Sequence, residues 1–172
     1  MMNENEARYP GNTIHPSVVI GPNVTMGTGN YIGPYCLIGM PAEHRAQWDP
    51  NNPGQVFIGD NCIITGHVTI DGGIEDETYI SDHVFIMKHA HIGHDAHICN
   101  GVTISCGAKI GGHAIIGDRS NIGLNAVVHQ RHSIGCDVMI GMGAVVPLKV
   151  QIEDNGVYAG NPARFLRVNK KP

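Results

Sequence analysis

The segment IGHDAHICNGVTISCGAKIGGHAII, residues 92–116, has an isoleucine at every sixth position. The same spacing of aliphatic residues runs unbroken from Ile80 to Val146 and recurs in two shorter runs nearer the N-terminus. Four residues after most of them comes a small residue, such as Ala96. A period of six fits neither a helix of 3.6 residues per turn nor a long alternating strand, so each hexad predicts a short strand followed by a corner.

Hexads of this kind bury their apolar face only by stacking on their neighbours, which predicts a solenoid. The pattern resembles the hexapeptide-repeat, left-handed parallel β-helix, in which three hexads close one triangular coil. We therefore expect an all-β fold with a single domain over residues 1–172, a size that can bury a core unaided, and with the repeat over 14–149.

Two interruptions of the repeat predict loops that protrude from the prism. The longer one, over residues 39–57, contains Pro and Asn turn signals and the single Trp, and the shorter one, over 71–79, is acidic. Residues 150–172 leave the repeat and form a short, basic C-terminal extension. The resemblance implies a homotrimer that packs along the prism faces.

Composition excludes several classes of protein. No run of about 18 apolar residues exists, which argues against membrane insertion, and a net charge of -4 argues against general nucleic-acid binding. The five cysteines form no CxxC pair, so we expect reduced thiols rather than a disulfide framework. These features predict a soluble, cytoplasmic protein.

Histidine is unusually dense in HAHIGHDAHI, residues 89–98. All four of its histidines occupy outward positions of the hexad, so they are not expected in the core. Residues about 18 apart become neighbours in such a solenoid, and this places His94, His113 and His129 within one residue of a single column. Because adjacent coils lie about 4.8 Å apart, the column spans about 10 Å, which suits a bound substrate better than one ion.

A zinc site remains an alternative for these histidines. Three imidazoles can hold Zn²⁺ with an open fourth position, and γ-class carbonic anhydrases use this fold. The spacing of His89 and His94 matches that class, whereas position 53, where the third ligand would lie, is Pro. We expect no metal site.

Three motifs carry a more specific resemblance: HIGHD (91–95), GGH (111–113) and AVVHQ (126–130). They resemble, at matching spacing, motifs of the UDP-N-acetylglucosamine O-acyltransferases of lipid A synthesis. This resemblance implies an acyltransferase that moves an acyl group from acyl carrier protein or CoA to a sugar, with an amino-sugar nucleotide such as UDP-N-acetylglucosamine as acceptor. It implies no permanently bound cofactor, since the acyl thioester is a cosubstrate.

The same resemblance implies roles for individual residues. His94 would be the general base, a role that an imidazole can fill at neutral pH. Asp95 would orient His94, and the Gly112 N–H would stabilise the oxyanion. The residues expected to line the groove or contact the acceptor sugar are His91, His113, His129, Gln130, Glu43 and Arg45.

The chain departs from that family in three ways. The sequence ends at Pro172 without the C-terminal helical domain that the family uses for nucleotide phosphates, and YAGNPAR (158–164) is similar to acetyl-CoA-dependent transferases. Met142 stands where a glycine can leave room for a long acyl chain, so we expect a short or medium acyl donor. The alternatives are an acetyl-CoA-dependent sugar N- or O-acetyltransferase, or a non-catalytic β-helix scaffold.

Overall fold

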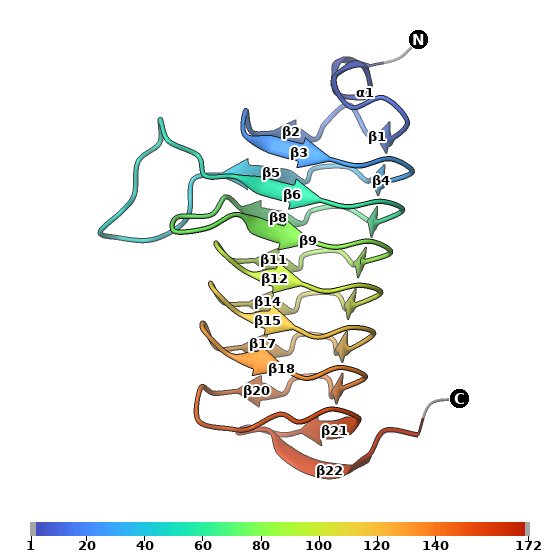
Figure 1. Ribbon diagram of the computed structural model, residues 1–172, viewed down its shortest axis with the longest axis vertical. Coiled ribbons are helices and arrows are strands. Elements are labelled where there is room, and N and C mark those ends of the chain that lie inside the picture. The colour runs from blue at the N-terminus through green and yellow to red at the C-terminus, as the bar shows by residue number, and fades with distance from the viewer. Residues whose placement is uncertain (1–2, 171–172) are drawn as a thin grey trace.

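The computed structural model describes residues 3–170, so the outermost two residues at each end of the expected domain lie outside it. The chain forms a triangular prism whose three faces are parallel sheets of short strands (Figure 1). Consecutive strands lie on consecutive faces, and most strands pair with the strand 18 residues further along, as Thr13 does with Tyr31. The predicted parallel β-helix is confirmed.

The strands of the three sheets follow one another in a fixed order along the prism. Sheet A contains β1 (Thr13–Ile14), β4 (Tyr31–Ile32), β7 (Ile63–Ile64), β10 (Phe85–Ile86), β13 (Thr103–Ile104), β16 (Asn121–Ile122), β19 (Met139–Ile140), β21 (Gly156–Ala159) and β22 (Arg164–Val168). Sheet B contains β2 (Val19–Ile20), β5 (Leu37–Met40), β8 (Thr69–Asp71), β11 (His91–Ile92), β14 (Lys109–Ile110), β17 (Val127–Val128) and β20 (Val145–Val146). Sheet C contains β3 (Val24–Met26), β6 (Val56–Ile58), β9 (Thr78–Ile80), β12 (His97–Ile98), β15 (Ile115–Ile116) and β18 (Ser133–Ile134).

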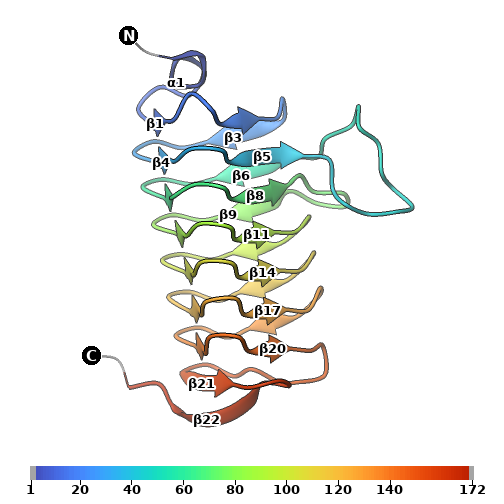
Figure 2. The same cartoon turned by 180° about the vertical axis from the view of Figure 1, so that it is seen from behind.

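The direction of winding can be followed in Figure 1. The strands of sheet C cross the front from left to right, the chain turns back at the right-hand edge, and the strands of sheet B return behind from right to left, one level lower in each turn. Figure 2 shows the same path from behind. The coil is therefore left-handed, as expected.

The core consists of the two inward series that the hexads define. From Ile80 to Val146 every sixth residue is buried, and so are the small residues between them, such as Ala96 and Ala108. His132 is an exception that the sequence analysis missed, because it occupies an inward small-residue position. Its Nε2 donates to the Val150 carbonyl at 2.6 Å.

Most corners contain one residue in the left-handed backbone region, with φ between 51° and 62° where it is not glycine. Asn, Asp and His adopt this region more readily than other residues with a Cβ. Four histidines occupy such positions: His67, His83, His89 and His113. Part of the histidine density therefore reflects the geometry of the corners rather than chemistry.

At the corner between sheets C and A, aspartates satisfy backbone donors of the coil before. Asp82 Oδ1 accepts the Asp60 N–H at 2.8 Å, and Asp154 Oδ1 accepts the Cys136 N–H at 2.7 Å. Asp118 does the same for Asn100. This capping removes free N–H groups from that corner.

Additional elements cover both ends of the prism. Helix α1 (Glu4–Arg8) covers the N-terminal end, and β22 folds back antiparallel on β21 at the other. The first loop covers residues 41–55 rather than the expected 39–57, because β5 and β6 include its ends. The second covers 72–77 rather than 71–79, because β8 and β9 do the same. In the part of the chain that the structure describes, no helix has the length and apolar character needed to cross a bilayer.

The burial pattern predicts which isoleucines matter for stability. Ile104 is fully buried, whereas the Ile115 side chain points out of sheet C and the residue is 45% exposed. Ile104→Ala should lower the free energy of unfolding by about 2–5 kcal/mol, because it removes buried methyl groups and leaves a cavity. Ile115→Ala, the control, should cost less than about 1 kcal/mol. Urea denaturation would measure both, and equal losses would contradict the inward series.

Candidate active site

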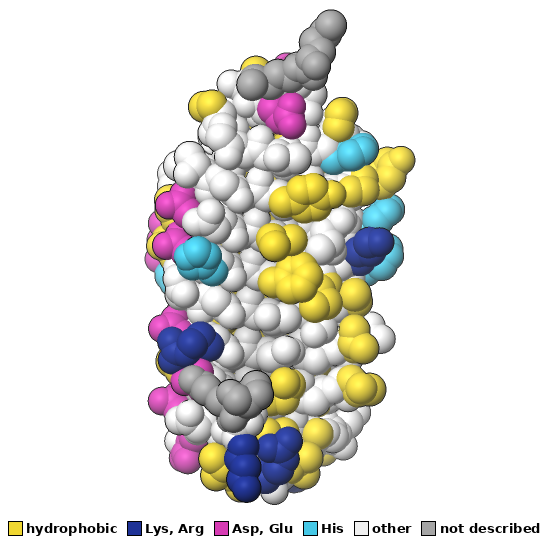
Figure 3. Space-filling view, turned by 90° about the vertical axis from the view of Figure 1, so that its right-hand side faces the viewer, with side chains coloured by type: hydrophobic (Ala, Val, Ile, Leu, Met, Phe, Trp, Pro, Cys, Tyr) yellow, Lys and Arg dark blue, Asp and Glu magenta, His cyan; other side chains and the backbone are white. Residues whose placement is uncertain are grey.

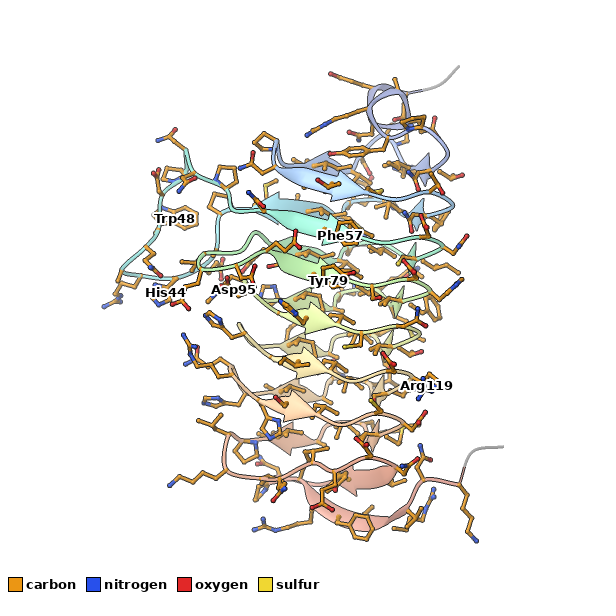
Figure 4. All side chains as sticks on the ribbon, in the orientation of Figure 1. His44, Trp48, Phe57, Tyr79, Asp95 and Arg119 are labelled. Carbon is orange, nitrogen blue, oxygen red and sulfur yellow. The ribbon has the colours of Figure 1, made fainter. Side chains whose placement is uncertain are left out.

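Both loops leave the prism at the same corner, between sheets B and C. The loop over 41–55 joins β5 to β6, and the loop over 72–77 joins β8 to β9 one coil further along. The next corner in this column is Gly93–Ala96, between β11 and β12, and it contains His94 and Asp95. The solenoid therefore places these two residues beneath both loops, and Figure 4 shows Asp95 at that edge of the prism.

His94 and Asp95 form a hydrogen-bonded dyad. His94 Nδ1 lies 2.6 Å from Asp95 Oδ2, and the two side chains are only 12% and 1% exposed. Adjacent residues of a strand point to opposite faces, but Asp95 has φ 57° at the corner, which lets the two side chains converge. Asp95 also receives hydrogen bonds at Oδ1 from the backbone N–H groups of Ile74, Glu75 and Asp76, at 3.0, 2.8 and 2.6 Å.

These contacts determine the protonation of the dyad. Burial alone would raise the pKa of Asp95, but the hydrogen bonds from Asp76, His94, Glu75 and Ile74 together hold this pKa below its usual value. The carboxylate therefore accepts the Nδ1–H of His94, and the lone pair lies on Nε2. No described residue hydrogen-bonds to His94 Nε2, and this atom is not closed off from solvent.

Gly112 lies one coil below His94, and the imidazole packs directly over it. A Cβ at position 112 would stand 2.7 Å from His94 Cε1 and Nε2, so only glycine leaves room for this ring. Among the described residues no acceptor takes the Gly112 N–H, in contrast to the aspartate-capped corner between sheets C and A. A free backbone donor thus lies beside the free nitrogen of His94.

Histidines surround the dyad, although not in the column that the sequence suggested. The His113 ring meets the His94 ring edge-on at 5.1 Å, and Arg131 Nη2 donates to His113 Nε2 at 3.2 Å. His129 is exposed, and its Nδ1–H donates to the Gln130 carbonyl. The reason is the register: counting in steps of 18, His113 lies beneath Asp95, and the next residue in that column is Arg131 rather than His129.

The first loop contributes a further histidine that the sequence analysis did not single out. The His44 ring meets the His94 ring edge-on at 5.8 Å, and Figure 4 shows His44 beside Asp95 at the edge of the prism, below Trp48. Arg131 also reaches Glu75 of the second loop at 3.9 Å. Such contacts between loops and corners leave no periodic signal, so the hexad pattern could not reveal them.

A groove of about 590 Å³ lies on the face of sheet B, beside the dyad. Its floor is formed by outward side chains of successive strands, and its wall by the first loop. The lining residues are Leu37, Met40, Pro41, Glu43, Trp48, Thr69, Asp71, His91 and Lys109. His91 Nδ1 lies 2.8 Å from Thr69 Oγ1, and Nε2 lies 3.8 Å from Asp71 Oδ2.

The structure brings some of the expected site residues together and separates others. Glu43 and His91 line the groove, whereas Arg45 and Gln130 are exposed outside its lining. Met142, 75% exposed, lies on the corner between β19 and β20, which joins sheets A and B. Within one chain it is therefore remote from the dyad.

The dyad and His113 were also tested as metal ligands. One atom each of His94, Asp95 and His113 lies within 4.8 Å of the others, close enough to share an ion. However, Asp95 Oδ2 already holds the His94 Nδ1–H, and Arg131 donates to His113 Nε2. This donor set fits an oriented imidazole better than the three-histidine zinc set.

Residues 77–112 match the family described as bacterial transferase hexapeptide (six repeats). The match covers strands β9 to β14 of the prism. The match includes His91, the dyad and Gly112. No curated protein sequence matches the chain significantly.

Three solved structures extend this comparison to most of the chain. It is similar to the UDP-N-acetylglucosamine acyltransferase of Bacteroides fragilis, with 27% identity and a TM-score of 0.85 over 92% of this chain and 62% of that one. The UDP-N-acetylglucosamine O-acyltransferase of Moraxella catarrhalis has 21% identity and a TM-score of 0.74, over 99% of this chain and 76% of that one. A mutant of the Caulobacter crescentus perosamine N-acetyltransferase, solved with CoA and GDP-perosamine, has 21% identity and a TM-score of 0.53, over 91% and 56%. The chain thus spans less than two thirds of the Bacteroides chain.

The lowered pKa of Asp95 predicts a pH-dependent contribution to stability. At neutral pH, Asp95→Asn should lower the free energy of unfolding by about 1.5–3 kcal/mol, because the buried acceptor loses its charge and the amide NH2 that replaces one carboxylate oxygen cannot accept the His94 Nδ1–H. A lowered folded-state pKa means that this contribution is complete above the ordinary carboxyl pKa of about 3.9 and disappears as the pH falls through the folded value. The difference between wild type and variant should therefore shrink as the pH falls below about 4.

Denaturant midpoints across this pH range would check the prediction. Asp118→Asn is a suitable control, since an Asn oxygen can still accept the Asn100 N–H, and it should change stability by less than about 0.5 kcal/mol. A difference between wild type and Asp95→Asn that grew as the pH fell below about 4 would contradict the assigned role of the carboxylate.

Proposed function

We propose that the protein is an acyltransferase that moves an acyl group from a thioester, acyl-CoA or acyl carrier protein, to a sugar, with His94 as general base. The observation that carries the proposal is the His94–Asp95 dyad, whose free Nε2 lies over Gly112 and next to the groove. The match to the transferase hexapeptide family and the similarity to a sugar acyltransferase and a sugar acetyltransferase support this class of reaction.

The chemistry follows from the positions of these groups. A nucleophilic oxygen or nitrogen of the acceptor attacks the thioester carbonyl while His94 Nε2 removes its proton. The Gly112 N–H stabilises the oxyanion of the tetrahedral intermediate. The C–S bond then breaks, and the proton on His94 passes to the sulfur that leaves as a thiol. Asp95 keeps the imidazole in the Nδ1–H tautomer and stabilises the imidazolium that forms between the two steps.

We assign the acceptor to the groove on sheet B. Trp48 and Leu37 offer apolar surface, while Glu43, Asp71 and His91 offer polar atoms that can bind a sugar. An amino-sugar nucleotide is the acceptor class we favour, because two of the similar structures are UDP-N-acetylglucosamine acyltransferases and a third contains GDP-perosamine. The thioester donor is a cosubstrate, so the proposal needs no permanently bound cofactor.

We further propose a cytoplasmic homotrimer. Apolar side chains form a band along the face of sheet A (Figure 3), where Tyr31 and Ile63 are exposed although large and hydrophobic. A band of this kind is typical of a surface that another chain covers. All five cysteines are free, which fits a reducing compartment.

Replacing the proposed base should abolish transfer without unfolding the protein. His94→Asn removes the basic nitrogen, so kcat/KM should fall at least about 100-fold, the usual contribution of a general base. His83→Asn is the matched control, because His83 is an exposed corner residue between sheets C and A. Thiol release from acetyl-CoA and from hydroxyacyl carrier protein, in the presence of UDP-N-acetylglucosamine and UDP-glucosamine, would measure the rates.

Two outcomes would contradict the proposal. Retained activity in His94→Asn would exclude the residue as the base. Stoichiometric zinc in the purified protein, lost in both His94→Asn and His113→Asn, would instead favour the zinc enzyme.

A further inference from the structure

The groove beside the dyad carries two carboxylates without a strong cationic partner. Asp71, 7% exposed, ends strand β8, and Glu43 lies in the first loop facing the same groove. Over residues 3–170, no lysine or arginine forms an ion pair with either side chain, and the nearest ring nitrogen to Asp71 is His91 Nε2 at 3.8 Å. A buried carboxylate with so little compensation is costly unless a ligand supplies the missing charge.

The cations near the groove are directed elsewhere. Lys109 lines the groove, but its ammonium donates to the His89 carbonyl, at the corner between sheets A and B. Arg45 is exposed outside the groove lining, and Arg131 is engaged by His113 and Glu75. These three cations therefore do not neutralise the Asp71 end of the groove.

The surroundings of Asp71 agree with this charge balance. Burial raises the pKa of Asp71, and His91 and the Glu43 backbone N–H offset this only in part. His91 is held by Thr69 at Nδ1, so its Nε2 faces Asp71. His91 lies three residues before His94, so a group held between Asp71 and His91 lies next to the dyad.

We propose that the acceptor presents a primary amine that Asp71, assisted by Glu43, binds as an ammonium, so that the enzyme forms an amide rather than an ester. This inference rests on the acyltransferase proposed above and specifies its acceptor. A hydroxyl acceptor would bring no charge to Asp71, whereas an ammonium pairs with it directly.

The reaction balances with one thioester and one amine. The bound ammonium first releases a proton to water, and the neutral nitrogen attacks the thioester carbonyl, so that a C–N bond forms. His94 Nε2 removes a second proton from that nitrogen. The C–S bond breaks, the sulfur takes the proton from His94, and the products are an amide and a free thiol.

Matched acceptors test the inference directly. UDP-glucosamine and the 3-amino-3-deoxy analogue of UDP-N-acetylglucosamine each carry a free amine, and UDP-N-acetylglucosamine carries none. With whichever thioester is consumed, kcat/KM for at least one amine should exceed that for UDP-N-acetylglucosamine by about tenfold or more, as expected for a charged hydrogen bond. Mass spectrometry and the resistance of the product to mild alkali would distinguish the amide from an ester.

The substitution Asp71→Asn removes the negative charge of this side chain and nearly keeps its shape. It should lower kcat/KM for the amine about 10- to 100-fold, mostly through KM, and change that for the hydroxyl acceptor less than about threefold. Asp118→Asn, at the corner between sheets C and A, should leave both rates unchanged.

Two results would overturn the proposal of an amine acceptor and leave the proposed acyltransferase activity in place. One is a higher kcat/KM for UDP-N-acetylglucosamine than for either amine, and the other is an equal loss of kcat/KM for both kinds of acceptor in Asp71→Asn. Absence of thiol release with every acceptor would overturn the proposed function and this inference together.

Discussion

Parallel pairing in an 18-residue register is the constraint on which the rest of the structure depends. Each inward isoleucine stacks on the isoleucine of the next coil, as Ile86 does on Ile104, and the backbone hydrogen bonds between coils leave no freedom to shift by one residue without moving the core side chains outward. Insertions can therefore be accommodated only at corners. Both insertions of this chain fall on one corner, and that corner holds the dyad.

The second loop is the less conspicuous of the two and contributes more to the geometry of the dyad. Three consecutive N–H groups, from Ile74 to Asp76, converge on one oxygen of Asp95 and leave the other for His94. The first loop forms the wall of the groove and brings His44 against the His94 ring. The repeat thus supplies a rigid position for the proposed base, and the insertions supply its hydrogen-bond partners and the wall of the groove proposed for the acceptor.

The sequence was sufficient to predict the fold, because the hexad period reports the buried isoleucines directly. The family resemblance singled out His94, which the structure places at a corner beneath the loops. The sequence did not predict which side chains surround His94. The position of a residue in the column was known only to within one residue, which does not distinguish His129 from Arg131, and neighbouring corner residues point in different directions. His44, Trp48 and Asp71 had no periodic signal, and helix α1 was missed because it precedes the repeat.

The central claim is that His94 and Asp95 act as one catalytic unit. A double-mutant cycle on kcat/KM with His94→Asn, Asp95→Asn and the combined variant tests it most directly. Each single variant should be severely impaired and the second substitution should add almost nothing, because Asp95 acts only through the imidazole. Losses that simply multiply would show that the two residues contribute independently and would contradict the account.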